Sequence, residues 1–463
     1  MPVEAIKIIV NNFFFMAFAT TAGSGATDAT TYLGTVGTDI IAFGQSEVLK
    51  VNIRGLAEAD NINASGTPFD GSFINGNNGA DQIRLARFSN SRALGGASTD
   101  YLEATVLSAS RINGNRDIDN LRILGSSNGS INGGQGDDTI TLGGAHGYSF
   151  VYGDNDNDSI TLENGSSFDR VTVNGNIGND TVTVQNIALL TNSSEIRGGA
   201  GNDSLNATNA ANVAVSFRGD LGNDTLTGGG QADTLRGGAG NDQFNGGGGT
   251  DSINGNTGND TIANSAGNDT VDGGAGVDNI DANTGADRIN TTTTGQAANR
   301  DVITNFTVNT DVLAISAALT SDGTAAGANA VIEDEATAAA NTNGAAYNLA
   351  GALAANTDAI DLVTLDSDVL DNDANADLSA ATDGTELLKA LVDTGVGSTA
   401  SGITVDGAGH AFYIATVDAG NGYLYHVNSG ADTTVTATEI ALVGTFTGSD
   451  IAGLTAGATL IMY

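Results

Sequence analysis

Apolar residues recur at a fixed interval of nine through the middle of the chain. From Gly219 to Asn290 the sequence divides without a gap into eight nonapeptides: GDLGNDTLT, GGGQADTLR, GGAGNDQFN, GGGGTDSIN, GNTGNDTIA, NSAGNDTVD, GGAGVDNID and ANTGADRIN. Position six is Asp in every unit, and position eight is always apolar, from Leu226 to Ile289. One apolar residue between polar neighbours, repeated after a Gly-rich turn, indicates short strands that each point one side chain inward.

The same unit recurs upstream at wider spacing. Each unit keeps Asp at position six and an aliphatic residue at position eight, and the units begin 19 to 23 residues apart, at Gly34, Gly55, Gly76, Gly95, Gly114, Gly133, Gly153, Gly175 and Gly198. Two nonapeptides make one coil with a Gly-rich turn on each side. An upstream coil keeps this turn on one side, and we expect irregular loops on the other. Such coils bury little alone and are stabilised by stacking on their neighbours.

These patterns predict an all-β chain that is mostly a parallel β-solenoid, followed by a smaller, mainly-β C-terminal domain. The expected parts are an N-terminal cap at 1–33, an irregular solenoid at 34–218, a contiguous β-roll at 219–290, a capping element at 291–320 and a C-terminal domain at 321–463. The cap includes the apolar segment Phe13–Ala19. In the C-terminal domain, alternation predicts a hairpin over Ala411–Val427, and apolar spacing predicts one helix near Glu386–Val392.

Composition and charge narrow the possible partners. The chain has 65 Gly and no Trp or Cys, so it must build its core by stacking small aliphatic side chains, and disulfides and thiolate catalysis are excluded. It carries 54 acidic and 16 basic residues, a formal net charge of −38, which argues against nucleic acid as a partner. No apolar stretch approaches the roughly 20 residues that a transmembrane helix needs.

The acidic residues recur at fixed positions of the repeat, which indicates that their carboxylates bind cations. In a parallel stack, equivalent carboxylates lie about 4.8 Å apart and repel one another unless a positive charge lies between them. The Gly-rich turns supply backbone carbonyls beside the same column. Carboxylate and carbonyl oxygens together suit calcium, which accepts six to eight oxygen ligands, better than magnesium. We therefore predict multiple Ca²⁺ ions, bound in a reaction coupled to folding.

The predicted calcium ligands are position-six aspartates and turn glycines: Asp138, Asp158, Asp180, Asp203, Asp224, Asp233, Asp242, Asp251, Asp260, Asp269, Asp278, Asp287, Gly222, Gly237, Gly240, Gly246, Gly255, Gly258, Gly273 and Gly276. The aspartates before Gly133 keep a second interpretation, as hydrogen-bonded turn residues. Some of their turns lack glycine at position four, where Glu58, Ser98 and Asp117 stand.

The segments GGAGND at Gly237–Asp242 and GGQGDD at Gly133–Asp138 resemble the haemolysin-type (RTX) repeat GGxGxDxUx. The resemblance extends over about residues 34–310. It implies a right-handed parallel β-roll, calcium held between successive turns, and export by a type I system that reads an uncleaved C-terminal signal. Asp301–Leu313 resembles the element that follows such rolls, which implies a strand cap, and Glu439–Tyr463 resembles a C-terminal targeting region.

Candidate catalytic residues are few, and we predict no enzyme. The histidines His146, His410 and His426 stand in no metal-binding motif, and the GSSNG segment around Ser127 lacks the strand–turn–helix context of a nucleophile elbow. We expect a secreted, extracellular structural protein of the bacterial surface, an S-layer-like or matrix subunit that associates with itself. The alternatives are an adhesin or carbohydrate-binding module, with a cell-surface glycan as partner, and a structural protein of a phage virion.

Overall fold

The computed structural model describes residues 8–10, 30–33, 39–42, 50–55, 57–191, 194–264, 266–291, 301–307 and 310–315, and strands at 331–337, 359–364, 411–418, 421–428, 440–447 and 460–462. These residues form strands and turns, which confirms the all-β prediction. None of them belongs to a helix long and apolar enough to cross a membrane. The predicted helix near Glu386–Val392 and the apolar segment Phe13–Ala19 lie outside the described residues. The chain divides into two compact units, residues 1–238 and 239–463.

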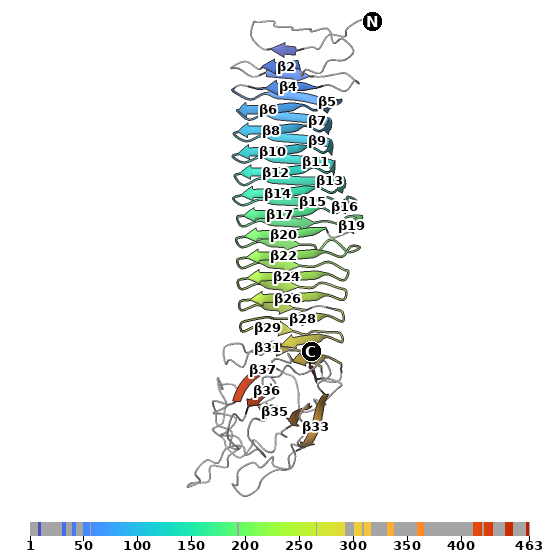
Figure 1. Cartoon of the computed structure of the whole chain (residues 1–463), viewed down its shortest axis with the longest axis vertical. Coiled ribbons are helices and arrows are strands. Elements are labelled where there is room, and N and C mark those ends of the chain that lie inside the picture. Colours follow the sequence, from blue (N-terminus) through green and yellow to red (C-terminus); the bar gives the residue numbers. More distant parts are fainter. Residues whose placement is uncertain are drawn as a thin grey trace. The chain divides into compact units, whose positions relative to one another are not determined.

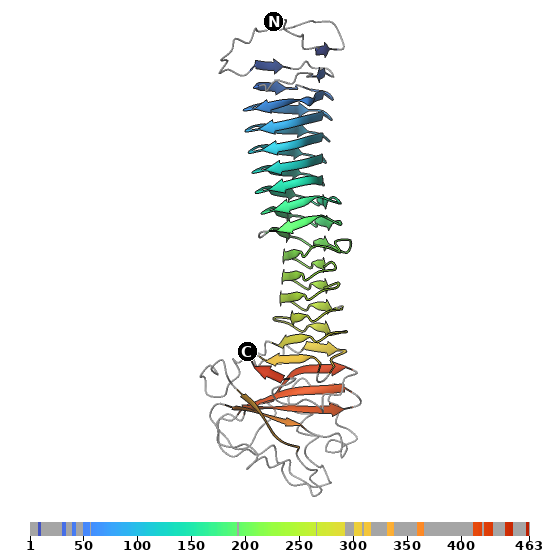
Figure 2. The same cartoon turned by 90° about the vertical axis from the view of Figure 1, so that its right-hand side faces the viewer.

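The first unit is a parallel β-solenoid with two main sheets. One sheet contains β2 (Thr30–Leu33), β4 (Val51–Arg54), β6 (Phe73–Asn78), β8 (Arg92–Ala97), β10 (Arg111–Arg116), β12 (Ser130–Gln135), β14 (Phe150–Asn155), β17 (Thr172–Ile177), β20 (Glu195–Ala200), β22 (Ser216–Leu221) and β24 (Thr234–Ala239). The other contains β3 (Asp39–Ala42), β5 (Asn61–Asp70), β7 (Gln82–Ser89), β9 (Tyr101–Ser108), β11 (Asn120–Ser127), β13 (Thr139–Gly147), β15 (Ser159–Leu162), β18 (Thr181–Val184), β21 (Ser204–Asn206) and β23 (Thr225–Thr227). Figures 1 and 2 show each strand lying directly on its equivalent in the next coil.

Short strands complete this unit. β16 (Ser167–Asp169) and β19 (Leu189–Thr191) extend the second half of β13, so the long strands of the earlier coils are each replaced by two short ones. β1 (Ile8–Val10) pairs antiparallel with β3 at the N-terminal side.

The core of the first unit is made of single-residue ladders from the two sheets. Position-eight residues of one sheet face equivalent residues of the other, and both sets are almost fully buried: Ile62, Ile83, Leu102, Leu121, Ile140, Ile160, Val182, Leu205 and Leu226 against Ile53, Ile74, Ala93, Ile112, Ile131, Val151, Val173, Ile196 and Phe217. Burying one such aliphatic side chain contributes roughly 1.5–3 kcal/mol. The predicted position-eight ladder is therefore confirmed as the core.

In the coils from Gly71 to Arg170 the turn opposite the Gly–Asp turn is regular, where irregular loops were expected. A residue in the left-handed region occurs once per coil, at Gly71, Asn90, Ala109, Asn128, Tyr148 and Arg170, with φ between 46° and 63°. Serines follow four of these, and their hydroxyls accept hydrogen bonds from the preceding coil: Val51 N to Ser72 Oγ at 2.9 Å, Ser72 N to Ser91 Oγ at 2.8 Å, Ser91 N to Ser110 Oγ at 3.1 Å and Gly129 N to Ser149 Oγ at 3.2 Å. We call this edge the serine column. It escapes a search for Gly–Asp units because it repeats neither aspartate nor a fixed glycine and its residues vary in type.

The second unit continues the nonapeptide coils. One row of parallel strands contains β25 (Gln243–Asn245), β27 (Thr261–Ala263), β29 (Asn279–Asp281) and β31 (Asp301–Thr304), and the other contains β26 (Ser252–Thr257), β28 (Thr270–Asp272), β30 (Arg288–Thr291) and β32 (Val312–Ile315). The segment predicted as a cap thus supplies β31 and β32, the two strands of a further coil. Each of these two strands also pairs with a strand from later in the chain. Those strands are β37 (Ile440–Thr447) and β38 (Leu460–Met462).

The described C-terminal strands form a mixed sheet. β33 (Val331–Thr337), β34 (Ala359–Thr364) and β35 (Ala411–Asp418) pair in parallel, whereas β35 pairs antiparallel with β36 (Asn421–Asn428), which confirms the predicted hairpin. The ring of Phe306 meets the ring of Phe446 edge-on at 5.4 Å between centroids.

Candidate metal centre

A column of buried aspartates runs along the Gly–Asp edge of the first unit. It contains Asp60, Asp81, Asp100, Asp119, Asp138, Asp158, Asp180, Asp203 and Asp224, each at most 2% exposed. In each carboxylate from Asp81 onward, Oδ1 accepts a hydrogen bond of 2.7–2.8 Å from the backbone N–H of the aspartate one coil earlier. This bond fixes the carboxylate and leaves Oδ2 for another role.

In seven aspartates of this column the second carboxylate oxygen is buried without a hydrogen-bond donor. This holds for Oδ2 of Asp81, Asp100, Asp119, Asp138, Asp158, Asp180 and Asp203. A buried charged oxygen without a partner is strongly unfavourable, so repeated examples at one position point to a missing positive partner.

The pKa values of these aspartates also show that the buried position disfavours their charged form. The pKa of Asp100, Asp119 and Asp158 is raised from 3.8 to about 8, because burial and, to a smaller extent, neighbouring carboxylates outweigh the lowering by the backbone hydrogen bond. Burial also raises the pKa of Asp138 and Asp203 to about 7. A cation beside the column would lower these pKa values again, because an opposite charge favours the charged form.

Position-one glycines bring a backbone carbonyl next to the orphaned carboxylate oxygen. A Cβ added to Gly153 would lie 2.1 Å from Asp158 Oδ2 and 2.7 Å from the carbonyl oxygen of Gly175. Three predicted ligands have the same arrangement. The distance from an added Cβ to Oδ2 of the aspartate in the same unit is 2.6 Å at Gly246, 2.1 Å at Gly255 and 2.3 Å at Gly273. Gly237 contributes its carbonyl oxygen, 2.7 Å from the Cβ position of Gly219. Only glycine leaves room for both oxygens here.

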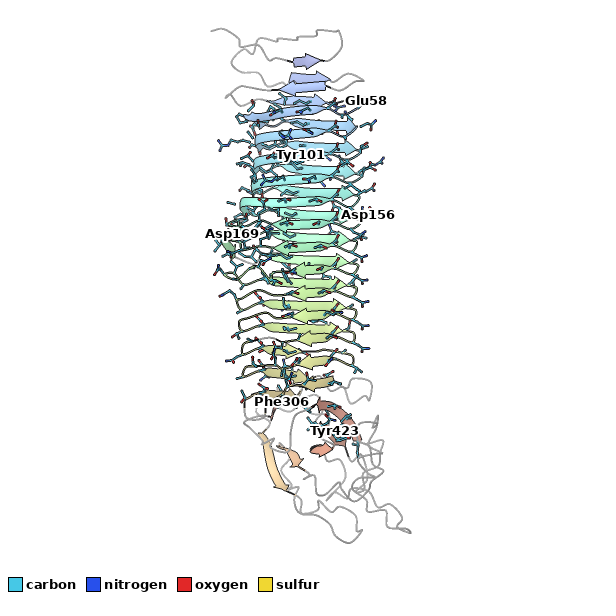
Figure 3. All side chains as sticks on the ribbon, turned by 180° about the vertical axis from the view of Figure 1, so that it is seen from behind. Glu58, Tyr101, Asp156, Asp169, Phe306 and Tyr423 are labelled. Atoms are coloured by element: carbon cyan, nitrogen blue, oxygen red, sulfur yellow. The ribbon has the colours of Figure 1, made fainter. Side chains whose placement is uncertain are left out.

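Most of the described position-four residues adopt the left-handed region. The predicted ligands Gly222, Gly240, Gly258 and Gly276 have φ between 122° and 146°. A Cβ on Gly222 would lie 1.9 Å from the carbonyl oxygen of Gly201, one coil earlier. Glu58, Ser98, Asp117 and Asp156 take positive φ at the same position, and Figure 3 shows Glu58 and Asp156 on the same edge. The turn backbone is therefore kept where glycine is replaced, and the aspartates before Gly133 share the geometry of the later ones.

A second ladder at position five locks these turns. Asn157 Oδ1 accepts the N–H of Asn179, Asn179 Oδ1 that of Asn202, and Asn202 Oδ1 that of Asn223, each at 2.7 Å. These bonds point along the chain in the direction opposite to the aspartate bonds. Each turn is therefore held by hydrogen bonds to both neighbouring coils.

The second unit has two aspartate columns, one on each edge. One contains Asp242, Asp260, Asp278 and Asp301, and the other contains Asp251, Asp269, Asp287 and Asp311, with N–H to Oδ1 distances of 2.7–3.1 Å. The predicted site residues therefore fall on two separate edges. Asp301 and Asp311 were not predicted as ligands. The signal that marks them is Asp followed two residues later by an apolar residue, Ile303 or Leu313.

Asp233 differs from the other predicted ligands. Its Oδ1 accepts the N–H of Val215 at 2.8 Å, and its Oδ2 accepts the N–H of Gly229 at 2.6 Å. Both oxygens thus already have donors, so Asp233 closes a turn in the way that the serines do upstream.

The available donors fit calcium. All are oxygens: carboxylate Oδ2 atoms and the carbonyls of glycines at positions one and four. In the described part of the chain no three His, Cys, Asp or Glu side chains converge on one point. Calcium accepts such a set in flexible geometry, whereas magnesium requires a strict octahedron.

The Ser–His contact of the first unit lies in the core. Ser126 Oγ is 2.8 Å from Nδ1 of His146, whose Nε2 is 2.9 Å from the carbonyl oxygen of Gly143 and whose ring stacks on Phe168. His146 is 3% exposed, and burial lowers its pKa to about 4. A substrate has no access to this pair. Ser127 is exposed at the end of β11, His426 lies on β36, and His410 lies outside the described residues.

Comparison with known families supports the metal assignment. Four segments of the chain match the RTX calcium-binding nonapeptide repeat: residues 125–146, 194–213, 218–253 and 254–289. The predicted resemblance is thus confirmed within 125–289. A search of curated proteins gave no match to this chain. Asp158 and Asp180 fall between the matched segments, yet they have the same hydrogen bonds as Asp138 and Asp203.

Proposed function

We propose that this chain, whose residues 125–289 carry RTX calcium-binding repeats, is a secreted structural protein of the bacterial surface in which calcium drives folding and assembly. Such repeats in a β-solenoid fit a calcium-binding extracellular protein. The observation that carries the proposal is the run of buried aspartates from Asp81 to Asp203, whose Oδ2 atoms have no donor. Calcium would supply the positive charge that these oxygens need.

The proposed ligands come from three positions of each turn. Position-six aspartates offer Oδ2, and the glycines at positions one and four offer carbonyl oxygens. We assign calcium to the predicted residues from Asp138 to Asp287, except Asp233, and we add Asp301 because it continues one column of the second unit. Asp311 continues the other column, but both of its oxygens already have donors, as in Asp233: Oδ1 accepts the N–H of Asp287 and Oδ2 that of Thr307.

An exposed apolar column supports self-association. Ile177, Ala200 and Leu221 pair in register on consecutive strands, and Ile177 and Leu221 are 60% and 59% exposed. Adjacent exposed apolar side chains mark interaction surfaces more often than isolated ones do. We propose that this column makes lateral contacts in an S-layer-like or matrix assembly, with export through a type I system.

Electron microscopy in millimolar calcium and in EGTA tests the assembly. We expect ordered sheets or filaments in calcium alone, and dispersed protein from the variant Ile177→Ser/Leu221→Ser. Ile118→Ser is the matched control, because Ile118 is also exposed but lies outside this column. Circular dichroism must show that all variants fold in calcium. Dispersed wild-type protein in calcium would overturn the structural role and leave calcium binding standing.

A further inference from the structure

A column of side chains on the outer face of the first unit combines guanidinium groups with aromatic rings. Phe73, Arg92, Arg111, Ser130 and Phe150 pair in register on the consecutive strands β6 to β14. They line an open groove of about 530 Å³ together with part of the serine column. Four steps between parallel strands give the column a length of about 19 Å. We call it the arginine groove.

The two arginines of this groove have no acidic partner. Ion pairs within the described residues engage Arg84, Arg122, Arg170, Arg197 and Arg218, but neither Arg92 nor Arg111. Asp70, next to the groove, accepts a hydrogen bond from Asn90 Nδ2 at 2.8 Å. Two exposed like charges on neighbouring strands repel each other. In a chain of net charge −38, leaving them unneutralised points to an anionic ligand.

Aromatic rings stand at both ends of the arginine pair. Phe150 is 49% exposed and its ring stacks on that of Tyr152 at 6.2 Å between centroids. At the other end the guanidinium of Arg54 lies over the ring of Phe73, 5.6 Å from its centroid. These contacts hold the rings in place, and an exposed ring face offers an apolar platform on which the flat side of a sugar ring can stack.

We propose that the arginine groove binds an acidic polysaccharide that runs along the column, across the strands. Carboxylate or sulfate groups of the glycan pair with the forked guanidiniums of Arg92 and Arg111, and a sugar ring stacks on Phe150. Nucleic acid fits less well, because its charge recurs about every 1.7 Å along a duplex and the strongly acidic chain would repel it. The proposal goes beyond the assembly role and does not depend on it.

Isothermal titration of the calcium-loaded full-length protein tests this site. The probes are hyaluronan octasaccharide for carboxylates, chondroitin sulfate octasaccharide for sulfates, a neutral dextran oligosaccharide of similar length, and a single-stranded DNA oligonucleotide. We expect binding of at least one acidic glycan, weakened by added salt, and none of neutral dextran. The variant Arg92→Gln/Arg111→Gln should lose about tenfold or more in affinity, because it removes two charge-assisted contacts.

The matched control is Arg116→Gln/Arg236→Gln. It removes the same net charge from two exposed arginines outside the groove that have no ion pair in the described residues. We expect it to bind like the wild type, whereas Phe150→Ser should weaken glycan binding and leave the salt dependence unchanged. No binding of either acidic glycan, an equal loss in the control, or tighter binding of DNA would each overturn the proposal. Electron microscopy of Arg92→Gln/Arg111→Gln in calcium tests assembly separately. If this variant assembles like the wild type, its loss of glycan binding does not come from a failure of assembly.

Discussion

Position-one glycines decide how closely a carboxylate can approach the backbone. At Gly255 the nearest atoms to an added Cβ are Asp260 Oδ2, at 2.1 Å, and the carbonyl oxygen of Gly273, at 2.3 Å. Neither atom can move easily, because one belongs to a hydrogen-bonded carboxylate and the other to the backbone of a paired coil. The sequence shows that glycine recurs here, but only the structure shows that it makes space for oxygen atoms.

Gly255→Ala should therefore destabilise the protein by about 2 kcal/mol or more, the scale of overpacking in a core. It should also weaken calcium binding. Denaturant unfolding and calcium titration measure the two effects. Gly66→Ala is the control, since an added Cβ there meets nothing within 4 Å, and it should change stability by less than about 0.5 kcal/mol. Equal effects of both substitutions would contradict the role of the glycine.

His146 should make stability fall in mild acid. Burial lowers its pKa from 6.5 to about 4, so the fold favours the neutral ring. This contribution is present above pH 6.5 and is lost as the pH falls toward 4. Between pH 7 and pH 5 the wild type should lose about 2 kcal/mol more than His146→Gln, with calcium kept saturating. If both proteins lose the same free energy of unfolding between pH 7 and pH 5, the fold does not keep the His146 ring neutral.

The two turn columns of the first unit differ in how visible they are in the sequence. The Gly–Asp turn repeats glycine, aspartate and an aliphatic residue at fixed offsets, so the solenoid and its aspartate column are predictable. The serine column depends on backbone conformation and on hydroxyl groups, and its positions are filled by residues as different as Gly71, Tyr148 and Arg170. Asp301 and Asp311 were missed because the segments before them no longer carry the Gly-rich turn.

Ala109→Asn should stabilise the protein by about 0.5–1 kcal/mol, because asparagine tolerates the left-handed region better than alanine does. Ala109 has φ of 46°, is exposed, and lies between Asn90 and Asn128 in the serine column. Thermal unfolding in calcium measures the change. The same substitution at Ala97, an accessible residue whose φ is not in the left-handed region, should give no gain.

Asp301 should act as an acceptor even though it lies beyond the nonapeptides. Its Oδ1 accepts the N–H of Asp278 at 3.1 Å in the buried core. Asp301→Ala leaves that N–H without a partner and should cost about 1–3 kcal/mol. Asp301→Asn keeps the acceptor and should retain most of the stability. If Ala and Asn give equal stability in denaturant unfolding, the added coil does not depend on this bond.

Over the whole molecule, the charge of −38 leads us to expect that calcium takes part in the folding reaction. The free energy of binding is available only to the folded coils, so it adds to their stability. The period of the repeats makes this prediction possible from sequence alone. The pairing of β33 to β37 beyond the hairpin could not be predicted, because those strands share no repeat.

Chelation with EGTA should lower the melting temperature strongly and reduce the β-sheet signal in circular dichroism, and millimolar magnesium should not restore it. Returning calcium should restore both. Unchanged spectra and melting after chelation would exclude calcium-coupled folding.

The serine column closes one edge of a coil with hydroxyl groups where the other edge uses carboxylates. A coil with serine on one edge contains one set of carboxylates to neutralise, whereas a coil with aspartate on both edges contains two. In a stacked chain each coil depends mainly on its neighbours, so order is lost first where the metal requirement is greatest and then spreads. The number of ordered coils should therefore change gradually with external calcium, and the protein would report the concentration of the ion in its surroundings rather than only its presence.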